Sequence, residues 1–288
     1  MPDKPNIVLA YIHNYRWSNI SDFVTSLRRT GFAGTIHFFA SGIDGAGMDE
    51  IRAHDVTVEP VAFPTAKLRN RYVHAWRLLR FLPLNLREKV LWKVCNFATL
   101  RFLLYDRYLA EHGDEYAAVL FADVRDVTFQ SNPFATPITG ICAYQEADGM
   151  TIASHHSNVG WIRKAYGAAE VARLADEPIL CSGTILGETQ AMMRFLTVYR
   201  QHLLRARRID SLGVDQGVYN SVLRANTPPD LTIYANGVAQ VLTMGLMNPD
   251  DIRFDAEDRV VDADGRIIPI LHQFDRHPAI AQRLGIET

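Results

Sequence analysis

The chain has 288 residues, of which 48% are hydrophobic and 22% charged, a composition typical of a soluble globular protein with one large α/β domain. Its formal net charge of -2 excludes a dedicated nucleic-acid-binding protein, which would carry a marked excess of basic residues. The sequence has no apolar run of about 20 residues and no signal peptide, so we expect a cytoplasmic location. The 3 cysteines are widely spaced, which predicts reduced thiols.

The first 40 residues predict a strand, a helix and a second strand. Residues 7–12 are apolar, Ser18 or Ser21 caps a helix that reaches Arg29, and residues 35–39 are again apolar. Such a crossover is right-handed and places the loop after the first strand at the edge where α/β sheets bind ligands. This loop lacks the glycine-rich fingerprint of dinucleotide-binding proteins. Residues 56–63 predict a third strand.

Residues 67–112 predict helices with a break near Pro83. Between residues 67 and 93 the acid Glu88 stands alone among basic and aromatic side chains, which are Lys67, Arg69, Arg71, Tyr72, Trp76, Arg77, Arg80, Phe81, Arg87, Lys89, Trp92 and Lys93. Two interpretations stay open for this stretch: a solvated face whose arginine stems cover apolar surface, or a patch that contacts anionic lipid headgroups at the inner face of a membrane. Arg101 follows, and we expect it to contact a phosphate or to form a surface salt bridge.

The most informative segment is the apolar run 119–122 followed by Asp123, Arg125 and Asp126. Apolar residues bounded by acids predict a buried strand of a parallel sheet, and ligands collect at the carboxyl ends of such strands. Two carboxylates there suit a hard divalent cation that carries phosphates. The alternative is an aspartate that caps a turn, with Asp126 paired to Arg125 in solvent.

The second half of the chain predicts further strands and helices of a mixed sheet. We expect strands over residues 138–144, 179–186 and 231–234, helices over 188–205 and 213–223, and a hairpin turn at 262–265 between residues 259–261 and 267–268. Ser182 and Gly183 interrupt the second of these strands, and glycine within a strand often marks close approach of a ligand. Asp215 and Gln216 fall in a first helical turn, and His272 follows the apolar residues 267–271.

Four clusters, taken in their order along the chain, carry a family resemblance: residues 123–126, 181–187, 213–220 and 271–277. This set resembles the nucleotide-sugar-dependent glycosyltransferases of the glycosyltransferase-A fold, in particular retaining families with a short acidic motif, an Asp-Gln pair and a late histidine. The resemblance implies one α/β domain over residues 1–288, with a mixed, mostly parallel sheet flanked by helices. Residues 1–130 form a Rossmann-like nucleotide-binding half, and residues 131–288 form the acceptor and catalytic half.

The resemblance also implies an activity and a cofactor. A sugar passes from a donor of the UDP or GDP type to a hydroxyl of a glycan or lipid-linked acceptor, and Mn²⁺ or Mg²⁺ bridges the donor diphosphate. Asp123, Asp126 and His272 are then the metal ligands, and Asp215 and Gln216 face the transferred sugar. For Ser182 and Gly183 the resemblance implies contact with the sugar or the acceptor. From their positions in the sequence we expect Tyr11, His13, Asn14 and Tyr15 to contact the base and ribose of the donor, and Arg101 and Arg125 to contact its diphosphate.

The chain departs from the family at the acidic motif, which is usually Asp-x-Asp. Arg125 occupies the second acidic position, and Asp126 comes one residue later. Either Asp126 supplies the second metal ligand, which we favour, or Arg125 neutralises the diphosphate directly. Two other functions remain alternatives. A sugar nucleotidyltransferase normally has a glycine-rich first loop, which residues 13–17 lack, and a non-catalytic carbohydrate-binding or scaffold protein would tolerate Arg125.

Overall fold

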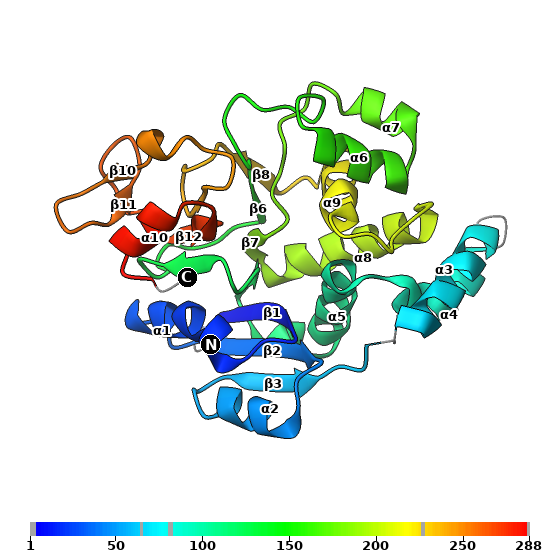
Figure 1. Ribbon diagram of the computed structural model, residues 1–288, viewed down its shortest axis with the longest axis horizontal. Coiled ribbons are helices and arrows are strands. Elements are labelled where there is room, and N and C mark those ends of the chain that lie inside the picture. The colour runs from blue at the N-terminus through cyan, green and yellow to red at the C-terminus, as the bar shows by residue number, and fades with distance from the viewer. Residues whose placement is uncertain (1–3, 64–65, 80–82, 226–227, 287–288) are drawn as a thin grey trace.

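The computed structural model describes residues 4–63, 66–79, 83–225 and 228–286, which form an α/β fold around a seven-stranded sheet (Figure 1). Neighbouring strands pair in parallel, except that β7 runs antiparallel to both β4 and β6. The predicted mixed, mostly parallel sheet flanked by helices is therefore confirmed. Across the sheet the strands are β3 (Thr57–Pro60), β2 (Thr35–Ser41), β1 (Ile7–His13), β4 (Ala118–Ala122), β7 (Thr184–Glu188), β6 (Ile141–Tyr144) and β8 (Leu231–Tyr234).

Helices cover both faces of this sheet because its central strands are apolar on both sides. In β1, Ile7 and Leu9 pack on one face, in a core shared with α5 (Phe97–His112), α8 (Thr189–Arg205) and α9 (Val214–Ala225). Val8 and Ala10 point to the other face, where α1 (Ser21–Arg29) and α2 (Gly45–Arg52) lie. This alternation follows from the two-residue period of a strand.

The helices α3 (Ala66–Leu79) and α4 (Leu84–Val94) form a hairpin at one end of the molecule (Figure 1). Trp76 and Arg87 donate hydrogen bonds to the carbonyl oxygen of Ala206 at 3.2 and 2.7 Å, and the Arg87 guanidinium lies 4.0 Å from the Trp76 ring centre. The basic, aromatic stretch is thus partly internal. Arg71, Lys89 and Lys93 are exposed, whereas the side chains at positions 67, 69, 77 and 80 lie outside the described residues.

A second, smaller sheet lies beside the main one and contributes to the site described below. It contains β5 (Val127–Phe129), β12 (Ile270–His272) and β9 (Val241–Thr243) in that order, and its register places His272 opposite both Val127 and Thr243. The remaining elements are η1 (Trp17–Asn19), η2 (Gly113–Glu115), α6 (His156–Ala165), α7 (Ala168–Arg173), η3 (Pro249–Asp251), β10 (Arg253–Phe254), β11 (Val260–Val261), η4 (Phe274–Arg276) and α10 (Pro278–Arg283).

Some predicted elements begin or pair differently in the structure. The strand expected over 179–186 begins only at Thr184, because Ser182 and Gly183 exchange hydrogen bonds with side chains and with Asp123 instead of a neighbouring strand. The turn at 262–265 is present, with Gly265 at φ 80°, yet Val261 and Ile267 form only an isolated bridge and β11 pairs with β10. Within the described residues, no helix is both long enough and apolar enough to cross a membrane.

Candidate metal centre and adjoining cleft

The cleft that gathers most of the predicted site residues opens at the carboxyl ends of β1 and β4. β1 and β4 are parallel neighbours. After β1, the chain forms β2 and β3 on one side of β1 and then returns to form β4 on its other side. Such a switch in strand order opens a crevice at the carboxyl edge of an α/β sheet. The cleft has a volume of about 430 Å³, and its walls come from the ends of β1, β4 and β12, the first turns of α5 and α9, and the segment before β7.

Three potential metal ligands meet in this cleft. The Nε2 atom of His272 lies 3.7 Å from a carboxylate oxygen of Asp123 and 3.9 Å from one of Asp126. One ligand atom from each residue lies within 4.8 Å of the others, and the described residues bring no other such group of histidine, cysteine or acidic side chains together. An octahedral Mg²⁺ with ligands at about 2.1 Å holds its ligand atoms about 3 to 4 Å apart. The arrangement therefore fits one divalent cation.

The orientation of His272 also fits a metal ligand. Its ring is fully buried, and Nδ1 lies 3.5 Å from both the Cys181 sulfur and the Thr243 hydroxyl. Nε2 faces the two aspartates and, although it is buried, has no hydrogen-bond partner within the described part of the chain. Metal-binding histidines usually hold the other ring nitrogen in a hydrogen bond in this way, which fixes the ring orientation.

Gly183 keeps the space between these ligands open. A Cβ atom at this position would lie 2.7 Å from Asp123 Oδ2 and 2.7 Å from His272 Nε2. The Asp123 N–H donates a hydrogen bond to the Gly183 carbonyl at 2.7 Å, so the backbones of these two residues are in contact. A side chain at position 183 would therefore fill the place that a cation would take.

Arg101 joins the metal group to the neighbouring acid Asp215. Its guanidinium pairs with Asp123, donates to Asp215 Oδ2 at 3.2 Å and donates to the Ser182 carbonyl at 3.0 Å. Because Arg101 is only 7% exposed, the expected surface salt bridge is wrong: this arginine is a buried link between two carboxylates. Burial would raise the pKa of Asp123, but the charges of Arg101 and His272 outweigh it and lower that pKa. Burial raises the pKa of Asp126, and the nearby Asp123 adds to this.

The first turn of α9 brings Asp215 and Gln216 to the cleft. The Gln216 amide nitrogen donates to Glu146 at 2.8 Å and to Asn158 at 3.1 Å, and its oxygen accepts from the Ser182 N–H at 3.4 Å. Burial raises the pKa of Asp215. Sequence reasoning missed Glu146 and Asn158. Glu146 follows the carboxyl end of β6, the same kind of position that identified Asp123, so its signal was present.

The end of β1 and the loop after it contribute only part of their predicted residues. Tyr11 and Tyr15 line the cleft, whereas His13 and Asn14 do not. His13 Nδ1 lies 2.7 Å from the Ser41 hydroxyl, and the Asn14 side chain lies 3.1 Å from His13 Nε2. Both side chains are thus held near the end of β2, outside the cleft.

Two exposed guanidinium groups stand at the rim of the cleft. Arg125 Nη2 lies 3.3 Å from Asp275 Oδ2, and Arg276 Nη1 lies 3.4 Å from the same oxygen. The single negative charge of Asp275 is therefore shared by two guanidinium groups, and a net positive charge remains beside the candidate metal group. Among the described residues, Arg125 pairs with Asp275 rather than with Asp123 or Asp126, and Asp126 joins Asp123 and His272 in the candidate metal group.

Two aromatic side chains that sequence reasoning did not identify, Phe97 and Trp161, also line the cleft. Gly213, at φ 79°, packs directly against the Trp161 ring, and only glycine fits there. Asn96 caps α5 and donates to the carbonyls of residues 209 and 211 at 3.1 and 2.7 Å, which fixes the start of α5 beside that of α9.

Comparison with protein-family models and with curated proteins found no match to this chain. The functional argument therefore rests on the chemistry of the cleft. A cation held by two carboxylates and one imidazole keeps coordination positions for further oxygen atoms, such as those of a phosphate.

Proposed function

We propose that this protein is a divalent-cation-dependent glycosyltransferase that moves a sugar from a nucleoside diphosphate sugar to a hydroxyl acceptor. The observation that carries the proposal is the group of Asp123, Asp126 and His272 at the switch point of the sheet, with Gly183 leaving room between them. The nearby pair Asp215 and Gln216 supports the same function, as does the resemblance of the four sequence clusters to the glycosyltransferase-A families.

Asp123, Asp126 and His272 would hold Mn²⁺ or Mg²⁺. When bound, the ion neutralises charge on the diphosphate leaving group. Arg125 and Arg276 at the rim provide further positive charge for the same oxygens, because a guanidinium fork matches phosphate and stays charged.

The donor base and ribose belong to the side of the cleft formed by the end of β1. Tyr11 and Tyr15 are half-buried there and offer aromatic faces, and the Tyr11 hydroxyl is hydrogen-bonded to Ser41 at 2.5 Å. His13 and Asn14, which we also expected to contact the donor, do not line the cleft. We therefore assign the donor contacts to the two tyrosines.

Asp215 and Gln216 would stabilise the reacting sugar. The amide of Gln216 is fixed at its nitrogen by Glu146 and Asn158, so its orientation is set before a ligand binds. A carbonyl or carboxylate oxygen beside the anomeric carbon lowers the barrier through an oxocarbenium-like transition state. The bond from the anomeric carbon to the diphosphate oxygen breaks, the bond to the acceptor oxygen forms, and the acceptor proton passes to the leaving phosphate. Retention of configuration follows from the family resemblance.

Thermal unfolding with nucleotide sugars of the UDP and GDP types, with and without Mn²⁺, tests this function. A ligand that binds only the folded state raises the unfolding free energy by about 2.7 kcal/mol at 100 times its dissociation constant. We expect the full gain only when both nucleotide sugar and cation are present, followed by release of the nucleoside diphosphate on turnover.

The Asp123→Ala variant removes one proposed ligand and should lose the cation-dependent part of this gain. Asp49→Ala is a matched control, because Asp49 is an exposed acid on α2 whose ion pair among the described residues is with Arg52. Equal donor affinity with Mn²⁺ in the Asp123→Ala variant and the wild-type protein would refute the metal assignment. No stabilisation of the wild-type protein by any nucleotide sugar would refute the function.

A further inference from the structure

The side-chain amide of Gln216 is held in one orientation by two neighbours that can each play only one part in a hydrogen bond. The ionised carboxylate of Glu146 can only accept, so the amide atom 2.8 Å from it has to be the Gln216 nitrogen. The Ser182 N–H can only donate, so the atom 3.4 Å from it has to be the Gln216 oxygen. Ser182 and Gln216 both line the metal cleft, and the Gln216 oxygen therefore lies on the cleft side of the amide.

Asn158 passes this direction on to His155. The fully buried Asn158 side chain accepts a hydrogen bond from the Gln216 nitrogen through its Oδ1 at 3.1 Å. Its Nδ2 therefore points the other way and lies 2.8 Å from Nδ1 of His155. Because an amide nitrogen only donates, His155 Nδ1 has to accept, which requires a neutral ring with its proton on Nε2. Glu146, Gln216, Asn158 and His155 thus form one directional chain of hydrogen bonds.

The start of α6 places both ends of this last contact. His155 directly precedes α6, and Asn158 lies three residues later in its first turn, so their side chains share one side of the helix. Gly217, which follows Gln216, allows α9 to pack closely on α6, since a Cβ there would lie 3.1 Å from the Ile162 backbone nitrogen. This close packing brings Asn158 within reach of Gln216.

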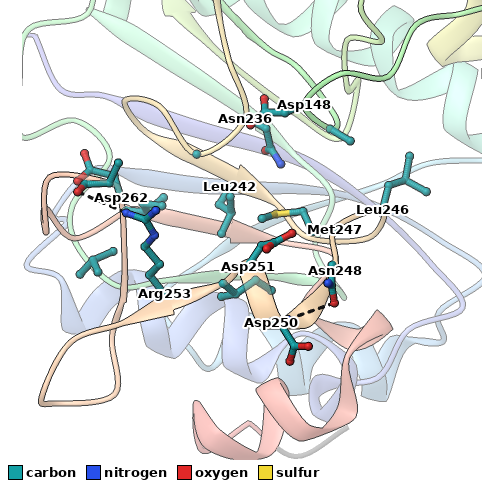
Figure 2. A pocket seen from close by; sticks show the side chains of 16 residues that line it. Asp148, Asn236, Leu242, Leu246, Met247, Asn248, Asp250, Asp251, Arg253 and Asp262 are labelled. Carbon is teal, nitrogen blue, oxygen red and sulfur yellow. Dashed lines mark hydrogen bonds between the residues drawn. The ribbon is translucent and has the colours of Figure 1, made fainter.

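Glu146 belongs to the loop after β6, and the next acid of that loop lies elsewhere. Glu146 is buried against Gln216, whereas Asp148, two residues later, is exposed. Asp148 lines a separate cavity of about 600 Å³ (Figure 2), and this cavity shares none of the described residues with the lining of the metal cleft. Asp148 therefore offers a matched control for substitutions of Glu146.

Other charged groups lie on the elements around His155. They are Glu146, the neighbouring His156, Asp176, Glu177 with its partner Arg224, Glu170 with Arg173, Asp215 with Arg101 and, at the other end of α6, Arg163 and Lys164. Glu146 belongs to the hydrogen-bonded chain itself, and burial raises its pKa. It therefore takes up a proton at a higher pH than an exposed carboxyl group, and experiments have to separate its protonation from that of His155.

We propose that His155 is a positioning residue of the transferase, which as a neutral hydrogen-bond acceptor holds the Gln216 oxygen towards the reacting sugar through Asn158. This inference rests on the proposed function, because Gln216 is the residue assigned to the sugar. A proton on His155 turns Nδ1 into a donor, which no longer accepts from Asn158. When the Asn158 amide turns over to accept from His155, its nitrogen meets the Gln216 nitrogen, and two donors face each other. The Gln216 amide then loses one of the bonds that orient it.

NMR of the full chain tests the hydrogen-bonded chain without any substrate. Nitrogen-15 spectra of the histidine rings should show neutral His155 with its proton on Nε2. As the pH is lowered, the side-chain amide signals of Gln216 should shift with the same midpoint as the His155 ring. This shift should persist in Glu146→Gln, which keeps an acceptor oxygen but does not titrate, and should vanish in His155→Asn.

Turnover tests the positioning role. It is measured as nucleoside diphosphate released, with Mn²⁺, from the nucleotide sugar that stabilises the wild-type protein. We expect kcat to fall about 2- to 10-fold as His155 takes up its proton, the range that one hydrogen bond provides, with a smaller change in KM. His155→Asn places an acceptor oxygen where Nδ1 lies and suits the position before a helix, so it should keep the high rate and extend it to lower pH. His155→Phe has no acceptor and should have the low rate throughout this range.

Two neighbouring residues provide the controls. His156 is exposed, with Nε2 3.3 Å from the Ser157 hydroxyl, and Asp148 lies outside the cleft. His156→Phe and Asp148→Asn should keep both the wild-type rate and its pH profile. Thermal unfolding shows whether each variant is folded, and His155→Asn remains informative if His155→Phe is not.

The outcomes distinguish this inference from the proposed function. A neutral His155 ring with its proton on Nδ1, a wild-type rate in folded His155→Phe, or a pH profile that is lost in Glu146→Gln but kept in His155→Asn would each overturn the inference. Turnover with Gln216 signals that do not follow His155 would overturn the inference alone. Gln216 signals that follow His155, without stabilisation by any nucleotide sugar, would overturn the proposed transferase and the positioning role with it, and would leave only a structural chain of hydrogen bonds.

Discussion

Gly183 is the residue at which one added carbon atom would disturb the candidate metal group most directly. A Cβ there would lie 2.7 Å from both Asp123 Oδ2 and His272 Nε2, and both side chains are held by other contacts. We expect Gly183→Ala to fold and to weaken Mn²⁺ binding about 10- to 100-fold, the usual effect of displacing groups around a metal. Calorimetric titration with Mn²⁺ measures the affinity of each variant for the ion.

Gly45 provides the matched control for that substitution. It is exposed in the first turn of α2, and no atom of the residues that the structure describes lies within 4 Å of a Cβ built there. Gly45→Ala should leave Mn²⁺ affinity unchanged. If Gly183→Ala binds Mn²⁺ as tightly as Gly45→Ala does, the ion does not sit between Asp123 and His272.

His37 makes the stability of the fold depend on pH at a distance from the cleft. Its ring is buried between Phe39 and Tyr108, and burial lowers its pKa to about 4. Between pH 6.5 and 4 the unfolded chain therefore binds a proton that the folded chain does not, so stability falls as pH falls. Relative to the wild-type protein, His37→Phe should lose less stability between pH 7 and pH 5, by about 2 kcal/mol.

Urea unfolding at pH 8, 7 and 5 measures this difference. From pH 8 to pH 7 the imidazole is largely neutral in both states, so the wild-type protein and the His37→Phe variant should change alike. Parallel losses of stability from pH 7 to pH 5 would show that His37 takes up its proton equally in the folded and unfolded chains.

Residues at or just after the carboxyl end of an apolar strand were the ones that the sequence could predict. Asp123, Asp126 and His272 stand at such positions, and the structure brings them together. The burial of Arg101 could not be predicted, because its partner Asp215 comes from a distant helix and is brought near only by the fold. Glu146 was missed although it also follows a strand and Asp148 comes two residues later, an acidic pattern that could have identified it.

Elements were predictable from the sequence where burial alone decides them. β1, β2 and β4 are apolar runs in the middle of the sheet, and their positions were predicted to within about two residues. The start of β7 depends instead on two hydrogen bonds of the Ser182 backbone, whose carbonyl accepts from Arg101 and whose N–H donates to Gln216, and no local sequence pattern predicts these contacts. Helix α2 begins with glycines at positions 45 and 47, which have low helix propensity, and depends on the Asp44 cap at 2.8 Å.

The helical hairpin of α3 and α4 is the element through which we expect contact with anionic lipid. Arg71 and Lys89 are exposed on it, whereas Arg87 is buried against Trp76 and is not available to a lipid. Charge reversal in the double variant Arg71→Glu with Lys89→Glu should therefore reduce association with phosphatidylglycerol vesicles at low salt. Cosedimentation measures the bound fraction, and added salt should weaken wild-type association in the same way.

The control for the hairpin is a pair of exposed basic residues on another helix. Arg163→Glu with Lys164→Glu on α6 changes the net charge of the protein by the same amount. Equal vesicle binding by the two double variants would mean that overall charge, and not the hairpin, governs association. The basic stretch would then act as the solvated face that was the other interpretation of its sequence.

At the scale of the whole molecule, the candidate metal group joins the two halves of the chain. Asp123 and Asp126 follow β4, while His272 lies on β12 in the smaller sheet. The Gln273 N–H donates to the Asp126 carbonyl at 2.7 Å, so a backbone contact already links the same two segments. A cation bound there would add a cross-link between these segments. We expect it to stabilise the small sheet against opening and to have little effect on the distant edge of the main sheet.

Hydrogen exchange can detect this cross-link directly. With Mn²⁺ and UDP at 100 times their dissociation constants, amides that exchange by opening of the small sheet should slow by up to about 100-fold. These amides belong to residues 127–129, 241–243 and 270–272, whereas those of β3 and α2 at the far edge should exchange at an unchanged rate.

His272→Ala should abolish the slowing. His112→Ala, at the exposed end of α5, should preserve it. Uniform slowing across the whole chain would indicate global stabilisation, because a local cross-link protects only the segments that must separate when it breaks.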